Sequence, residues 1–161
     1  MSQRDRRLAG IEALYKREFS AFVRVARGIV GDPERALEAV HDGFADAIRA
    51  RTGLRDEAAL DAWVWRSVVN AARKATRRPL VEVSALTDVP LVEPPKLREL
   101  APALARLPER QRLIVFLRYY ADLDYRRIAE VVGVEVGTVS ASLAAAHRSV
   151  RLALEEVETS G

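Results

Sequence analysis

The segment from Asp122 to Arg151 restricts the fold more than any other. Apolar residues on either side of Gly133 are spaced as in the buried stripes of two helices. Asp124 is a residue type that caps helix N-termini, and Gly133 can adopt the left-handed conformation that strains other residues at helix C-termini. Beyond this glycine, apolar residues recur at spacings of three and four. They are Val136, Val139, Leu143, Ala146, Val150 and Leu154. Two helices joined by so tight a turn predict a helix-turn-helix, although a plain helical hairpin has the same pattern.

The first half of the chain predicts three longer helices. An apolar stripe over residues 8–29 indicates the first helix, which ends at Gly31. The tripeptide Asp32-Pro33-Glu34 then supplies an N-cap, a first-turn proline and a first-turn acid, so a second helix begins here. A third apolar pattern runs from about residue 57 to 78 and finishes in basic residues. Its helical spacing predicts that Trp63 lies in the core and that Trp65 is the more exposed of the two tryptophans.

A proline-rich segment separates these helices from the C-terminal ones. Residues Pro79 to Pro95 contain four prolines and three acidic residues but no basic residue. These seventeen residues are too many for an ordinary connection inside one compact domain. We therefore predict an all-α fold of two small helical domains joined by an acidic, proline-rich linker. The predicted parts are a three-helix unit over residues 1–78, the linker over 79–96, a four-helix unit with the helix-turn-helix over 97–155, and a frayed tail over 156–161.

Composition excludes several classes of function. The chain has no cysteine, which rules out disulfides and thiolate metal sites and fits a reducing cytoplasm. His41 and His147 are isolated, no serine has a paired base in sequence, and no glycine loop could hold phosphate, so we expect no metal, no cofactor and no enzyme activity. The sequence lacks the long apolar run that a signal peptide or a membrane span requires, so we expect neither. Lys and Arg exceed Asp and Glu by 16 to 11 up to Pro79, but basic charge alone is weak support for nucleic-acid binding.

The order of these parts resembles the extracytoplasmic-function group of the sigma-70 family, the promoter-recognition subunits of bacterial RNA polymerase. Three segments carry the resemblance, and together they extend it over nearly the whole chain. They are IVGDPERALEAVHDGFADAI, LDAWVWRSVVNAARKATRR and LPERQRLIVFLRYYADLDYRRIAEVVGVEVGTV. The resemblance implies a sigma factor of the cytoplasm that binds core RNA polymerase, through its clamp helices and flap, and directs promoter-specific transcription initiation. Promoter DNA and an anti-sigma factor are the other implied partners.

Two other interpretations remain open at this stage. The chain could be a sigma-like interaction protein that binds core polymerase or a regulator without reading the −35 element itself. It could also be an unrelated two-domain transcriptional regulator, which would explain the helix-turn-helix but leave the N-terminal helices without a role.

The resemblance also assigns roles in the N-terminal unit. The contact with the polymerase clamp falls on Glu38, His41 and Asp42, with His41 in place of the family's usual glutamine. Asn70 corresponds to an asparagine that helps to read a flipped −10 base, and an amide can both donate to and accept from a base edge. The loop over residues 49–56 corresponds to one that captures an unstacked base. Contacts to the phosphates of the opening −10 DNA are expected from Arg66, Arg73, Lys74, Arg77 and Arg78.

The second helix of the helix-turn-helix departs from the family pattern. Relatives carry basic residues along this helix to read the −35 element, whereas here its outward positions are serine and alanine until Arg148. Small side chains cannot reach guanine edges in a bidentate manner, and each lost pair forfeits roughly 1–3 kcal/mol of discrimination. We therefore expect weak −35 specificity and mostly phosphate contacts. The expected −35 contacts are Arg126, Arg127, Thr138, Ser140, Ser142 and Arg148.

Overall fold

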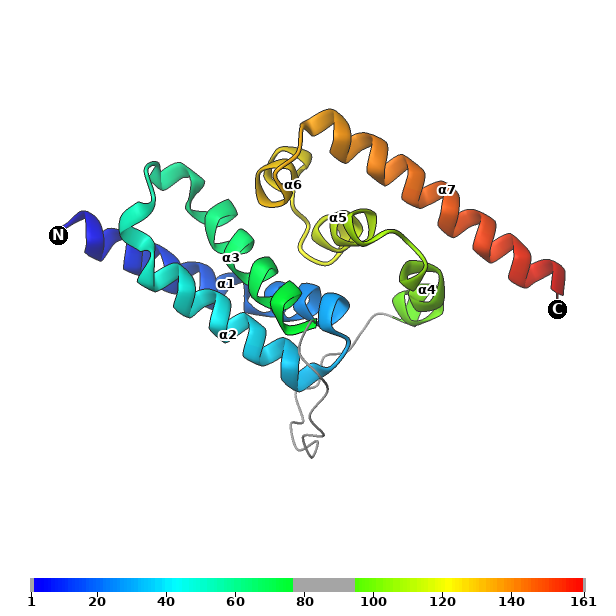
Figure 1. Ribbon diagram of the computed structural model, residues 1–161, viewed down its shortest axis with the longest axis horizontal. Helices are drawn as coiled ribbons and strands as arrows, with labels where there is room; N and C mark the ends of the chain where they lie inside the picture. The colour runs from blue at the N-terminus through cyan, green and yellow to red at the C-terminus, as the bar shows by residue number, and fades with distance from the viewer. Residues whose placement is uncertain (1, 77–94, 161) are drawn as a thin grey trace. The chain divides into compact units, whose positions relative to one another are not determined.

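The computed structural model describes residues 2–76 and 95–160 and, within the latter range, side chains from Leu100 to Thr159. All regular structure among these residues is helical (Figure 1). The chain divides into two compact units, with the division between Val89 and Pro90. The predicted all-α fold with two helical units is therefore confirmed. Arg77, Arg78 and most of the predicted linker lie outside the described residues.

The first unit consists of three helices, each packed against the other two. They are α1 (Gln3–Val30), α2 (Pro33–Arg49) and α3 (Leu60–Thr76), and the short 3-10 turns η1 (Arg51–Gly53) and η2 (Glu57–Ala59) connect α2 to α3. The predicted boundary between the first two helices is confirmed. Gly31 ends α1 with a φ of 88°, and the Asp32 side chain caps α2 by accepting a hydrogen bond from the Arg35 backbone N–H at 2.9 Å.

The core of the first unit centres on Trp65. Its indole ring stacks on Phe22 at a centroid distance of 3.8 Å, and its Nε1–H donates to the Glu18 carboxylate at 3.2 Å. Trp65 is 0% exposed, whereas Trp63 is only half-buried, so the predicted order of exposure was wrong. The reason is that α3 packs against both α1 and α2, which buries a wider face than a single apolar stripe predicts.

The crossing of α2 and α3 is unusually close at Gly43. A Cβ atom added there would lie 2.5 Å from the Cα atom of Val68, well inside any normal contact distance. Glycine is therefore required at this position for steric reasons, and not for backbone conformation. This close approach fixes the position of α3 against α2. It thereby fixes where the exposed side chains of α3 lie on the surface of the unit.

The second unit contains α4 (Pro95–Ala105), α5 (Glu109–Tyr119), α6 (Tyr125–Val132) and α7 (Val136–Ser160). The Asp124 side chain accepts a hydrogen bond from the Arg127 backbone N–H at 2.8 Å, and Gly133 ends α6 with a φ of 78°. The axes of α6 and α7 are bent by 100° relative to each other. This angle is that of a helix-turn-helix and not of an antiparallel hairpin, so the predicted motif is confirmed.

At both ends of α7, the structure differs from what the sequence pattern predicted. Val139, Leu143 and Ala146 are buried as expected, but Val136 is 46% exposed and Leu154 is 40% exposed. The tail expected to fray is helical through Ser160. Helix α7 has 25 residues, whereas α4, α5 and α6 have 8 to 11 each. Its last turns are correspondingly exposed, with Leu154 at 40% and Val157 at 69%.

Within residues 2–76 and 95–160, no single helix is both long enough and apolar enough to cross a bilayer. Only α6 and α7 taken together meet that test, with a sharp bend between them.

Candidate functional site

The exposed face of α3 carries the residues predicted to contact −10 DNA. Arg66, Asn70, Arg73 and Lys74 are all exposed, and their spacing of three or four places them along one side of the helix. The opposite side of α3 is buried against α1 and α2, which leaves this polar face as the side open to a partner. The structure therefore gathers these four residues on one surface of the first unit.

A polar hollow of about 470 Å³ lies beside this face, between α2 and α3. Asp46 of α2 forms one wall, and α3 supplies the others. The α3 residues that line it are Ser67, Asn70, Ala71, Arg73 and Lys74. The hollow therefore presents a carboxylate, an amide, a hydroxyl and two cations around one opening, a set of donors and acceptors suited to the edge of a nucleobase.

The three residues predicted to contact the polymerase clamp point in two directions on α2. His41 lies towards α1, where its Nε2 is 3.2 Å from the Tyr15 hydroxyl oxygen. Asp42 lies towards α3 and shares a smaller hollow, of about 220 Å³, with Lys74. Glu38 is exposed. Asp42 is thus placed at the border between the predicted polymerase surface and the predicted DNA surface.

The loop between α2 and α3 has a buried anchor and an exposed rim. Leu54 is 5% exposed, whereas Thr52, Gly53, Arg55 and Asp56 are all exposed. The Asp56 side chain accepts a hydrogen bond from the Ala58 backbone N–H at 3.0 Å, which caps η2 and so begins the approach to α3. The predicted base-capturing loop is therefore a folded segment with its polar side chains outward.

The predicted −35 surface lies on α6 and the first half of α7. Arg126 and Arg148 are exposed, and Arg127 is half-buried. Along α7, Ser140, Ala141 and Ala144 are exposed, while Thr138 and Ser142 are half-buried. The structure thus places small side chains at the outward positions, with cations only at the edges of this surface.

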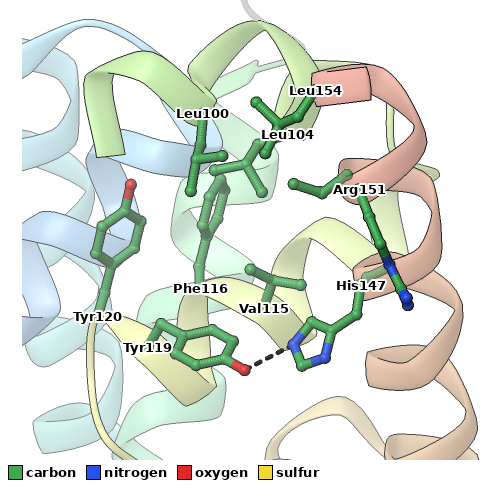
Figure 2. A pocket seen from close by; sticks show the side chains of 11 residues that line it. Leu100, Leu104, Val115, Phe116, Tyr119, Tyr120, His147, Arg151 and Leu154 are labelled. Atoms are coloured by element: carbon green, nitrogen blue, oxygen red, sulfur yellow. Dashed lines mark hydrogen bonds between the residues drawn. The ribbon is translucent and has the colours of Figure 1, made fainter. Parts of the chain in front are cut away.

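An apolar groove of about 450 Å³ lies between α4, α5 and α7. Figure 2 shows Leu100 and Leu104 on α4 and, across the groove, Arg151 and His147 on α7, with Phe116 and Val115 of α5 below the leucines. At one edge, the Tyr119 hydroxyl oxygen is 2.6 Å from Nε2 of His147. The other residues that line the groove are Tyr120, Ala146, Val150 and Leu154.

Sequence reasoning did not predict this groove, although α5 carries a signal for it. Residues 113–117 are five consecutive apolar positions, all buried, and two tyrosines follow them at 119 and 120. A helix that packs on one side alone needs apolar residues on about a third to a half of its surface. The excess on α5 indicates a second apolar contact, which the groove provides.

Comparison with known proteins matches two family models to this chain. Residues 14–79 match the model for sigma-70 region 2, and residues 97–149 match the model for sigma-70, region 4. The chain is 32% identical over 141 residues to the ECF RNA polymerase sigma factor SigM of Mycobacterium tuberculosis. The aligned residues cover 84% of this chain and 72% of the relative. It is 26% identical over 160 residues to the RNA polymerase sigma-E factor of Streptomyces antibioticus, covering 92% of this chain and 84% of the relative.

Solved structures that share the fold include two complexes. One is CnrH in complex with the cytosolic domain of CnrY, with a TM-score of 0.71 and 20% sequence identity over 92% of this chain and 90% of that one. The other is the sigma factor RpoE in complex with the anti-sigma factor NepR from Bartonella quintana, with a TM-score of 0.70 and 18% identity over 89% of this chain and 96% of that one.

Proposed function

This chain belongs to the extracytoplasmic-function group of the sigma-70 family, and we propose that its two units divide the work of promoter recognition between the −10 and −35 elements. As a member of this group, it binds core RNA polymerase and promoter DNA and directs transcription initiation. Sigma factors are initiation factors of the polymerase and act where it does, so we assign the protein to the cytoplasm. The alternative of a sigma-like interaction protein is not favoured, because the relatives named above are sigma factors.

In our proposal, the unit over residues 1–78 binds the polymerase and reads the −10 element. The observation that carries it is the exposed α3 face next to the polar hollow. Arg66, Arg73 and Lys74 contact the phosphates of the opening duplex, joined by Arg77 and Arg78 beyond the described residues. Asn70 lines the hollow and reads an unstacked base there with its amide.

Polymerase binding by the first unit is assigned to α2, through Glu38, His41 and Asp42. Glu38 and His41 are exposed and available to the clamp helices. Asp42 shares a hollow with Lys74, so it also lies beside the DNA-contacting face. We therefore expect substitution of Asp42 to affect both polymerase binding and promoter opening, whereas substitution of Glu38 affects polymerase binding alone.

The unit over residues 97–155 has two surfaces in this proposal. The −35 element lies along α6 and the first half of α7, where Arg126, Arg127 and Arg148 hold phosphates and Thr138, Ser140 and Ser142 add short polar contacts. The polymerase flap occupies the apolar groove, because a groove with exposed leucine and tyrosine side chains suits the apolar face of a helix. An anti-sigma factor would compete with the polymerase for such surfaces.

Reconstitution with core RNA polymerase tests the division of roles. Wild-type protein should yield promoter-dependent run-off transcripts. Asn70→Ala should keep its affinity for core polymerase but lose about 1–3 kcal/mol in open-complex formation, the value of one base-reading amide. Glu12→Ala, exposed on α1 and outside every proposed contact, is the control. Equal losses in polymerase affinity and in open-complex formation by Asn70→Ala would mean that Asn70 has a structural role.

A further inference from the structure

The first turns of α1 hold the loop that joins α2 to α3. The Arg7 guanidinium donates through Nη1 to the Arg51 carbonyl oxygen at 2.9 Å and reaches the Thr52 carbonyl oxygen at 3.5 Å. The two carbonyl groups lie 44 and 45 residues further along the chain. Three residues after Arg7, a Cβ atom added to Gly10 would lie 2.6 Å from Cδ2 of Leu60, so this part of α1 also touches the start of α3.

The peptide that Arg7 binds is the centre of the turn. The Arg51 carbonyl oxygen also accepts a hydrogen bond from the Leu54 backbone N–H at 3.4 Å, and Gly53 N–H donates to the Ala50 carbonyl oxygen at 2.9 Å. From the other side, the Arg51 guanidinium donates to the Ile48 carbonyl oxygen at the end of α2, at 2.6 Å. The backbone of η1 is thus held at both ends, and the side chains of Thr52 and its neighbours remain exposed.

The N-terminus of α1 is itself fixed beside this loop. The Ser2 hydroxyl and the Asp5 side chain form a reciprocal cap at the first turn. The hydrogen bond donated by the Ser2 hydroxyl, at 2.6 Å, lowers the pKa of the Asp5 carboxyl below its ordinary value, and the positive charge of Arg51 adds a smaller lowering effect. The cap orders the first turn of α1, from which Arg7 reaches the loop.

We propose that Arg7 is a positioning residue that sets which base the loop over residues 49–56 accepts at the −10 element. The proposal rests on the proposed function. Selecting a base by hydrogen bonds requires the loop to hold its polar groups in one arrangement before the base arrives, because a mobile loop fits several bases about equally well. A guanidinium bound to two successive carbonyl groups restrains the backbone at the point from which the exposed side chains project.

Arg7→Gln removes the charged donor, and Arg6→Gln is the matched control. Arg6 is exposed on the same turn of α1, so its substitution removes the same charge without touching the loop contact. The assay is run-off transcription by reconstituted polymerase on promoters that carry each of the four bases at each −10 position. For Arg7→Gln, we expect the ratio between the best and the second-best base at one position to fall by about tenfold, equivalent to about 1.4 kcal/mol. Arg6→Gln should retain the wild-type ratio, and Arg7→Lys should restore part of it.

Amide hydrogen exchange in the free protein gives a second measurement. In Arg7→Gln, the Gly53 and Leu54 amide hydrogens should exchange faster than in the wild type. Amide hydrogens in the middle of α2 should keep their wild-type exchange rates. An equal loss of transcription on every promoter, with unchanged base ratios, would overturn the proposal and leave Arg7 a structural role. If the wild-type protein gives no promoter-dependent transcript, the proposed function itself fails, and the role of Arg7 fails with it.

Discussion

Gly43 lies where α2 crosses α3, and its replacement by alanine tests how closely these helices approach. The added Cβ atom would lie 2.5 Å from the Val68 Cα atom and 2.9 Å from its backbone nitrogen. Carbon atoms in contact are about 3.5–4.0 Å apart, so the two backbones would have to separate by about 1 Å. Overpacking of this kind costs roughly 1–3 kcal/mol. Replacing glycine by alanine in a helix returns up to about 1 kcal/mol, so we expect a net loss of about 1–2 kcal/mol in the free energy of unfolding of the first unit.

The two tryptophans make this loss measurable in the whole chain. Both Trp63 and Trp65 lie on α3, so tryptophan fluorescence reports the unfolding of the first unit alone. With a urea dependence of about 1–3 kcal/mol per molar, the midpoint should fall by about 0.3–2 M. Gly53→Ala is the control, because a Cβ atom there meets nothing within 4 Å. A midpoint for Gly43→Ala at or above that of the wild type would refute the close crossing.

Two further substitutions test the second unit. Gly133→Ala places a side chain at a φ of 78° and should destabilise this unit by about 1–2 kcal/mol, measured by the helical circular dichroism signal during thermal unfolding. Leu154→Glu puts a charge in the apolar groove and should weaken binding to core polymerase, measured by titration with labelled protein. Leu152→Glu, two residues away and outside the groove lining, should leave that affinity unchanged, and equal effects from both would contradict the role of the groove.

Local signals in the sequence were enough to predict most helix boundaries. Gly31 and the tripeptide Asp32-Pro33-Glu34 end one helix and begin the next through interactions within four residues. Asp124 and Gly133 begin and end α6, the first helix of the helix-turn-helix, in the same way. Such signals act between residues that are close in sequence, so they do not require knowledge of which distant residues pack together.

The burial of Trp65, the apolar groove and the contact of Arg7 with the loop were missed because they depend on distant parts of the chain. Trp65 is buried because α3 meets α1 and α2 at once, and its indole finds a carboxylate 47 residues earlier, at Glu18. The apolar groove needs three helices to form. The bond from Arg7 to the loop also joins residues far apart in sequence, and nothing in the pattern of α1 marks this arginine among its neighbours. The assignments of Asn70, Glu38 and the other contact residues remain predictions.

The small side chains on α7 lead to the last prediction, which concerns promoter choice. Ser140, Ala141 and Ala144 are exposed where longer side chains would reach base edges, so this helix can make few base-specific hydrogen bonds. Single −35 substitutions should then each cost less than about 1 kcal/mol in run-off transcription, below the usual 1–3 kcal/mol for a mismatched base pair. Substitutions in the −10 element should abolish transcription.

Ser142→Arg tests the same idea in the opposite direction, because it adds a long cationic side chain to α7 and should strengthen DNA binding. Ser142 is half-buried on the same helix, and an arginine there should neutralise one more phosphate. Affinity for DNA should rise for all sequences, and the slope of log affinity against log salt should steepen by about one. Ser160 lies at the far end of α7, so Ser160→Arg adds the same charge away from the proposed DNA surface and serves as the control. Large, position-specific losses across the −35 series would show that α7 reads bases in spite of its small side chains, and the inference from their size would then be wrong.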